Sequence, residues 1–248
     1  MKKLGLIGGV GYVATLEYYK MINEQFQSRT EAHKKVDANP PMTIESLNLA
    51  TAYAHIENKN MTAFTQLFVD AAKNLHHAGA DFAAIAANTA HIVFDEIQAQ
   101  SPLPMIGIVD ETCKYAQQQG FRKLIVFGTN FTMNSGMYEA RAQSYGLDVF
   151  VPSGTDKQCI HDIIFPNLEA GVVLADEKAA LIAIVEKLVV QHQADALVLA
   201  CTELPLAIKQ EDVSVPVLDT GRIHVDAILE YMISTSSAGF SAQELIRL

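Results

Sequence analysis

The sequence lacks tryptophan and contains only three cysteines, at positions 113, 159 and 201. Three cysteines are too few for a disulfide framework, so we expect a reducing compartment and take the cytoplasm as the default location. Basic residues are also scarce: 18 Lys and Arg stand against 28 Asp and Glu, a formal net charge of −10. Because phosphate binding needs clustered Lys and Arg, we expect no nucleic-acid partner.

The chain also lacks a long apolar run. No uninterrupted apolar stretch reaches about 18 residues, so we expect no membrane span. Residues 1–14 resemble a short signal peptide, but the apolar part holds four glycines and no clear cleavage site follows, which argues against that interpretation. Half of the 248 residues are apolar, which excludes a disordered, collagen-like or coiled-coil chain and allows one large or two small domains.

Short apolar runs alternate with helical patterns along the chain. The apolar runs predict buried parallel strands at residues 4–7, 42–47, 82–86, 105–108, 124–127, 149–151, 196–199 and 215–218. Periodic segments predict helices at residues 15–27, 61–77, 110–119, 136–145, 175–191 and 224–234. Strands that alternate with helices indicate an α/β fold with mostly parallel sheets.

An internal repeat divides the sequence. Asp81 precedes an apolar run that leads into Ala87, and Asp195 precedes a similar run that leads into Cys201, six residues on in both cases. A proline opens the next predicted strand of each half, so we infer two related α/β halves in which position 87 is the counterpart of position 201. We place the first domain at residues 1–112 plus 219–248 and the second at residues 113–218. Chance similarity between two common strand-loop-helix units is the alternative.

Polar and small residues follow several of the predicted strands. Ligands of parallel sheets bind beyond the carboxyl ends of the strands. The residues at these positions are Gly8-Gly9, Ala87-Asn88-Thr89, Gly128-Thr129 and Cys201-Thr202. Two halves that face each other would place these groups around one cleft.

Cys201 is the strongest single candidate for chemistry. If a helix or turn starts there, backbone N–H groups point at the sulfur and lower its pKa, and the thiolate can act as a nucleophile or a base. A buried free cysteine is the alternative, although the polar neighbours Thr202 and Glu203 favour chemistry. Cys113 and Cys159 are expected to be structural or surface cysteines.

Asn88 and Thr89 offer hydrogen-bond donors for an anion at a strand-to-helix junction. Ordinary helix capping is the alternative. His91 is a candidate general acid or an orienting residue, and otherwise an ordinary first-turn histidine.

The segment after the first strand has the pattern Gly9-x-Gly11-x-x-Ala14, a loose dinucleotide-binding fingerprint. That fingerprint needs an acidic residue about 20 positions further on, at the end of a second strand, whereas Glu45 comes too late and lies inside its strand. No His, Cys, Asp or Glu cluster has metal-ligand spacing. We therefore expect neither a nicotinamide cofactor nor a metal.

Taken together, these motifs resemble the aspartate/glutamate racemase family of cofactor-independent amino-acid racemases. The resemblance rests on Gly5-Leu6-Ile7-Gly8-Gly9, Asn88-Thr89-Ala90-His91, Gly128-Thr129, Ile163-Ile164-Phe165, Cys201-Thr202-Glu203-Leu204-Pro205 and Ile223-His224. It implies two pseudo-symmetric domains, each a mostly parallel sheet flanked by helices, with the active site in the cleft between them. It further implies no cofactor, a homodimer, and a small amino acid or dicarboxylate as partner.

The resemblance also assigns roles to residues. Two cysteines of the family face each other across the substrate, one base falling at Cys201 and the other at position 87. The implied substrate-binding residues are Gly9, Val10, Gly11, Asn88, Thr89, Thr129 and Thr202, with His91, Glu203 and His224 in support. The implied activity is racemization of aspartate or glutamate by α-proton abstraction, with Arg141, Lys157 or Arg222 as candidates to bind the side-chain carboxylate.

Alanine stands where the first cysteine is expected, at position 87. Alanine carries no exchangeable proton, so we expect reduced or one-sided activity through Cys201 alone. The alternatives are a replacement base, as in family members that carry Thr there, and an engineered Cys→Ala form. A one-thiol lyase or decarboxylase on a related dicarboxylate and a non-catalytic amino-acid-binding form also remain open.

Overall fold

The computed structural model describes residues 1–29 and 39–234. Its strands are β1 (Leu4–Gly8), β2 (Met42–Ser46), β3 (Phe82–Ile85), β4 (Met105–Ile106), β5 (Lys123–Phe127), β6 (Asp148–Phe150), β7 (Ala196–Leu199) and β8 (Val217–Asp219). Each predicted strand is therefore present, with ends that differ by a few residues.

The helices of the described residues alternate with these strands. They are α1 (Tyr12–Arg29), α2 (Leu49–Glu57), α3 (Met61–His77), α4 (Phe94–Gln100), α5 (Ile108–Gln118), α6 (Asn130–Asn134), α7 (Met137–Gln143), α8 (Gly154–Ile164), α9 (Ala175–His192), α10 (Leu204–Ala207) and α11 (Thr220–Ile233), with the 3₁₀ helices η2 (Thr89–Val93), η3 (Leu168–Ala170) and η4 (Gln210–Asp212). All of the predicted helices are confirmed, whereas α2, α4, α6, α8 and α10 are not among the predicted segments.

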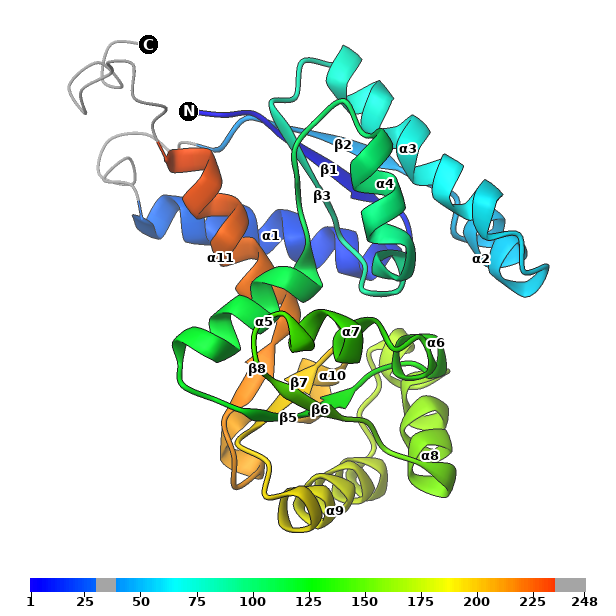
Figure 1. Cartoon of the computed structure of the whole chain (residues 1–248), viewed down its shortest axis with the longest axis vertical. Coiled ribbons are helices and arrows are strands. Elements are labelled where there is room, and N and C mark those ends of the chain that lie inside the picture. The colour runs from blue at the N-terminus through cyan, green and yellow to red at the C-terminus, as the bar shows by residue number, and fades with distance from the viewer. Residues whose placement is uncertain (30–38, 235–248) are drawn as a thin grey trace.

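The strands form two four-stranded sheets, one above the other in Figure 1. Their orders are β2-β1-β3-β4 and β6-β5-β7-β8, and every pair of neighbours is parallel. The second sheet therefore repeats the topology of the first, which confirms the α/β fold of two related halves.

Equivalent hydrogen bonds set the register at the amino end of each sheet. In the first sheet, the Asp81 carboxylate accepts from the Lys3 backbone N–H at 2.6 Å, and the Asp81 N–H donates to the Lys3 carbonyl at 2.9 Å. In the second sheet, Asp195 makes the same pair of bonds with Lys123, at 2.9 and 2.8 Å. The aspartates that marked the repeat in the sequence thus perform the same structural task.

Both faces of each sheet are covered by helices. In the first half, Leu6 packs with Tyr18 of α1 and Ile228 of α11, while Ile7 packs on the opposite face with Phe68 of α3. In the second half, α5 and α7 cover one face, and α8 and α9 cover the other. Strands that are buried on both faces read as continuous apolar runs, which explains the predictive value of those runs.

The chain crosses between the halves through α5 and returns through α11. Both helices lie between the two sheets in Figure 1, and α11 packs against α1 of the first half. Residues 235–248, which we assign to the first domain, lie outside the described residues. The domain limits at residues 112 and 219 stay a prediction.

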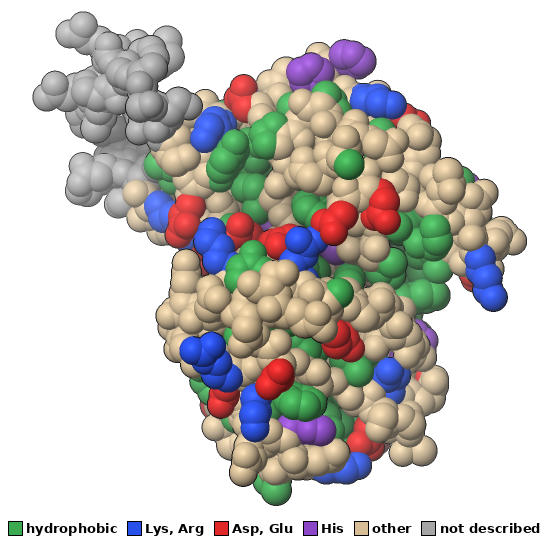
Figure 2. Space-filling view, in the orientation of Figure 1, with side chains coloured by type: hydrophobic (Ala, Val, Ile, Leu, Met, Phe, Trp, Pro, Cys, Tyr) green, Lys and Arg blue, Asp and Glu red, His purple; other side chains and the backbone are tan. Residues whose placement is uncertain are grey.

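Charged side chains of both signs lie along the boundary between the halves in Figure 2. At this boundary, Arg141 of α7 forms ion pairs with Asp95 of α4 and, at 3.4 Å, with Asp110 of α5.

None of the helices in residues 1–29 and 39–234 combines the length and the apolar character needed to cross a membrane.

Candidate functional site

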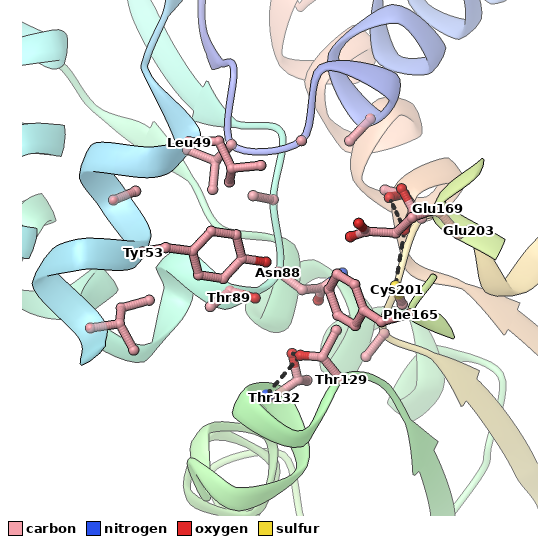
Figure 3. A pocket seen from close by; sticks show the side chains of 18 of the residues that line it. Leu49, Tyr53, Asn88, Thr89, Thr129, Thr132, Phe165, Glu169, Cys201 and Glu203 are labelled. Atoms are coloured by element: carbon pink, nitrogen blue, oxygen red, sulfur yellow. Dashed lines mark hydrogen bonds between the residues drawn. The ribbon is translucent and has the colours of Figure 1, made fainter. Parts of the chain in front are cut away.

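A pocket opens at the carboxyl ends of both sheets and encloses about 660 Å³ of empty space, part of it open to solvent. Most of the predicted site residues line it: Val10, Gly11, Ala87, Asn88, Thr89, Thr129, Cys201, Thr202 and Glu203. The two halves thus build one pocket from the strand ends, as the repeat predicts (Figure 3).

Ala87 and Cys201 reach this pocket through equivalent strand ends. The Ala86 N–H donates to Ile7 of the neighbouring strand at 2.9 Å, and the Ala200 N–H donates to Phe127 at 2.7 Å. The next residue in each half is Ala87 or Cys201, and these side chains are 7% and 8% exposed. Position 87 is therefore the structural counterpart of Cys201 as well as its counterpart in the sequence.

The Cys201 thiol is hydrogen-bonded to a buried carboxylate. Its Sγ donates to Glu203 Oε2 at 2.9 Å, and the Thr202 hydroxyl donates to the same oxygen at 2.7 Å. Burial, and then the negative charge of Glu203, raise the pKa of Cys201 well above its usual value. The predicted lowering by a helix start is wrong, because α10 begins only at Leu204 and the nearest charge is negative. At rest, Cys201 is a protonated thiol.

The glycine loop after β1 is shaped by contacts with β2. Gly9 has a φ of +81°, and a Cβ there would lie 2.1 Å from the Leu47 carbonyl oxygen. Only glycine fits at position 9 because of this close contact. Gly9 itself is not among the lining residues, whereas the next two residues, Val10 and Gly11, are. The Thr15 hydroxyl, which accepts from the Gly9 N–H at 2.9 Å, holds the loop from the other side.

The Asn88 side chain joins the two halves of the protein. Its amide donates to the Thr220 hydroxyl at 3.1 Å, and its oxygen accepts from the Tyr138 hydroxyl at 2.7 Å. All three side chains are buried. The amide therefore does not cap η2, and the donors that remain for an anion at this junction are mainly backbone N–H groups.

The predicted threonine donors are partly occupied as well. Thr129 caps α6, since its hydroxyl oxygen accepts from the Thr132 N–H at 3.3 Å. The Thr202 hydroxyl proton is directed to Glu203. The contribution of these side chains to substrate binding stays a prediction.

His91 and His224 lie beside the pocket and are not part of its lining. His91 Nε2 accepts from the Ile108 N–H at 3.1 Å, so Nδ1 carries the proton that is donated to the Ala87 carbonyl at 2.9 Å. Burial lowers the pKa of His91 to about 3 and that of His224 to about 4. Both rings are neutral, and His91 holds the strand end through its bond to the Ala87 carbonyl; its predicted role as a general acid stays a prediction.

Among the described residues, no Lys or Arg side chain lines the pocket. Arg141 is paired with two aspartates at the boundary, Lys157 donates to Asn134 at 2.9 Å, and Arg222 lies outside the lining. The charged residues of the lining are Glu169 and Glu203. None of the three predicted cations lines the pocket, and their role in binding a substrate carboxylate stays a prediction.

The main part of the site that the sequence analysis misses is α2 and the segment at η3. Leu49, Tyr53 and Ile56 of α2 line the pocket together with Phe165 and Glu169. A signal for α2 was present, because apolar residues recur at positions 49, 52, 53 and 56 after an Asn48 cap that accepts from Ala50 N. Only Leu47 and Asn48 separate β2 from the nine residues of α2, so the change of period falls within a few residues and is easily missed.

The cysteines and possible metal ligands can be checked directly. All three cysteines are free; Cys113 is buried in α5 and Cys159 is half-buried in α8, which confirms that neither belongs to the pocket. Within the part of the chain that the structure describes, no three His, Cys, Asp or Glu side chains lie close enough together to hold a metal ion.

Comparisons with known proteins agree with this architecture. A sequence profile of the Asp/Glu/Hydantoin racemase family matches residues 7–228. The broad specificity amino-acid racemase RacX of Bacillus subtilis (strain 168) is 25% identical over 217 residues, which cover 88% of this chain and 92% of RacX. A solved aspartate racemase homologue from Pyrococcus horikoshii OT3 is 35% identical with a TM-score of 0.84, over 94% of this chain and 100% of that one. Picrophilus torridus aspartate racemase, 24% identical with a TM-score of 0.72 over 94% of each chain, shares the fold.

Proposed function

Because this chain belongs to the Asp/Glu/hydantoin racemase family, we propose that it transfers a proton at the α-carbon of an amino acid, with Cys201 as the exchanging thiol. The observation that carries this proposal is the 2.9 Å hydrogen bond from the Cys201 thiol to Glu203 in the pocket that both sheets form. A buried thiol beside a carboxylate that can take its proton is a thiol that can become a base.

The proton moves in balanced steps. Glu203 takes the thiol proton, and the positive ammonium group of an incoming amino acid favours the charge on sulfur. The Cys201 thiolate then takes the α-proton from one face, and the electron pair left on carbon is delocalised into the α-carboxylate. Backbone N–H groups at Asn88, Thr89 and Thr202, at the strand ends, are suitably located to stabilise that carboxylate as its charge grows.

Ala87 limits what happens on the opposite face. The Ala87 side chain is neither an acid nor a base, and the nearby His91, which is outside the lining, has both ring nitrogens bonded to backbone groups. Cys201 therefore returns a proton chiefly to the face from which it removed one. Exchange of the α-proton with solvent then proceeds with retention of configuration, and inversion is slow. The activity is accordingly that of an isomerase impaired at its first base.

A one-thiol lyase is the second candidate, since a single thiol at Cys201 suits a protonation on one face after loss of carbon dioxide. Carbon dioxide release from a dicarboxylate would identify it. The predicted restriction to aspartate or glutamate is not part of our proposal, because no cation of the described residues lines the pocket. The predicted homodimer and cytoplasmic location stay predictions.

The test is α-proton exchange in deuterium oxide, followed by nuclear magnetic resonance for both enantiomers of a panel of amino acids. We expect exchange in one enantiomeric series to be much faster than inversion. C201A should abolish this exchange, while C159A, which removes a half-buried thiol outside the lining, should retain it. Undiminished exchange in C201A would remove Cys201 from the mechanism, and amino-acid binding without any exchange would indicate the non-catalytic form.

A further inference from the structure

The charge inside the pocket has a single sign. Its charged side chains are Glu169 and Glu203, and no described Lys or Arg balances them. Glu203 accepts hydrogen bonds from Cys201 and Thr202. Once Cys201 has lost its proton, the thiolate adds a further negative charge. An aspartate or glutamate ligand carries a net charge of −1 and would bring another carboxylate into this field, with no cation to receive it.

Glu169 is the pocket carboxylate that has no partner of its own. It lies on η3 at the mouth of the pocket and, within residues 1–29 and 39–234, forms no ion pair or hydrogen bond. Partial burial, and then the charge of Glu203, raise its pKa to about 7. The negative charge of Glu203 disfavours the ionised form of Glu169. A cation that binds nearby would stabilise that ionised form.

Tyr53 and Glu169 line the same pocket from opposite sides. Figure 3 shows Tyr53 on one side of the pocket and Glu169, Glu203 and Cys201 on the other. Burial raises the pKa of Tyr53 to about 12, with Glu169 as the next cause, which places the phenol within the field of that carboxylate. The neutral Tyr53 ring offers a π-face to a cation.

The wall behind Tyr53 is aliphatic and aromatic. Leu49, Tyr53 and Ile56 lie on one face of α2, and Phe64 of α3 adjoins them. A chain of methylene groups can bury its apolar surface along such a wall while its charged end stays near the mouth. The α-carbon end of a ligand must remain at Cys201, and Glu169 lies on the same side of the pocket as Cys201, facing Tyr53 and the α2 wall across it (Figure 3).

We propose that the site prefers amino acids with a long, positively charged side chain, for which Glu169 is the counter-ion, over aspartate and glutamate. This inference rests on the proposed function for the position of the α-carbon beside Cys201. Glu169 acts here as a specificity-determining residue, while the proton chemistry remains with Cys201 and Glu203. The stem of the side chain lies along the α2 wall, and its cationic end lies between Glu169 and the Tyr53 ring.

Binding is measured by isothermal titration calorimetry with lysine, with norleucine as its uncharged counterpart of similar shape, and with glutamate. We expect lysine to bind about fivefold more tightly than norleucine, the effect of a partly exposed ion pair, and glutamate to bind more weakly than both. E169Q should remove the advantage of lysine over norleucine, and E169K should invert the order of lysine and glutamate. E57Q is the matched control, because it removes an exposed charge from α2 outside the lining.

The outcomes separate this inference from the proposed function. Glutamate binding at least as tightly as lysine, or an advantage of lysine that survives in E169Q, overturns the role of Glu169. Selective lysine binding with no α-proton exchange supports the inference and contradicts the proposed function. Faster exchange with glutamate than with lysine supports the function and overturns the inference. Because Glu169 is exposed, unchanged circular dichroism and Tm should show that the variants remain folded.

Discussion

A thiol placed at position 87 should convert one-sided exchange into racemization. The Ala87 side chain is 7% exposed and lines the pocket at the strand end equivalent to that of Cys201. The backbone there is already fixed, since the Ala87 carbonyl accepts from His91 at 2.9 Å. A87C therefore adds one sulfur atom at a rigid position that faces the same pocket.

The expected gain follows from what a positioned acid or base contributes. General acid–base catalysis is worth about 10²- to 10⁴-fold in rate, which corresponds to about 3 to 5 kcal/mol of activation free energy. The side chain at 87 has the pocket on one side, so the added atom displaces little of the packed core. We expect the inversion rate to rise by about 100-fold or more, while the rate of exchange with retention changes far less.

The assay follows two signals from one enantiomer in deuterium oxide. Chiral chromatography measures the appearance of the mirror-image product, and nuclear magnetic resonance measures the loss of the α-proton from the starting enantiomer. A86C is the matched control, because Ala86 packs in the core formed with α1 and α11 and does not line the pocket. Its inversion rate should not rise.

One result would contradict this prediction for position 87. If A87C folds with an unchanged Tm and its new thiol reacts with a small thiol reagent, but the inversion rate equals that of the unmodified chain, then position 87 does not face the reacting α-carbon. The pocket would then have been adapted to chemistry that uses a single face, and the lyase would become the leading candidate.

Three further predictions concern stability, each measured as the free energy of unfolding in denaturant. The pKa of His224 falls from 6.5 to about 4 on folding, so the unfolded chain takes up the extra proton and stability is lost as pH falls from 6.5 to about 4. H224Q should lessen that loss by about 1.4 kcal/mol per pH unit. Y138F leaves a buried amide oxygen without its donor and should cost about 1 to 3 kcal/mol; no loss would mean that the bond between the halves contributes nothing. Gly9 and Gly79 have φ values of +81° and +80°, but only Gly9 has backbone within 2.1 Å of an added Cβ, so G9A should cost clearly more than G79A.

Much of the fold can be predicted from the sequence because its sheets are parallel and buried. The central strands β1, β3, β5 and β7 are short, mostly apolar and buried runs, and the spacing from Asp81 to Ala87 and from Asp195 to Cys201 reveals the repeat. The pocket position of Cys201 follows from that spacing and from the rule for strand ends. These features depend on local patterns that any sequence of this class must show.

What the sequence does not reveal depends on contacts between distant segments. From the sequence alone, the Asn88 amide is expected to be available to bind an anion. In the structure it donates to Thr220 and accepts from Tyr138. The pKa of Cys201 is raised because burial and Glu203 outweigh the effect of the nearby turn. No Lys or Arg of the described residues lines the pocket, and Arg141 instead pairs with Asp95 and Asp110 at the boundary between the halves. None of these outcomes is encoded in local spacing.

The paired bonds of Asp81 with Lys3 and of Asp195 with Lys123 lie at the amino ends of the strands, opposite the pocket. Each half therefore fixes the alignment of its strands at one end and presents its reactive side chains at the other. Substitutions at the pocket end leave this alignment untouched. An exchange of cysteine and alanine at position 87 thus alters chemistry at little structural cost, and a duplicated scaffold of this kind can change reaction type one strand end at a time.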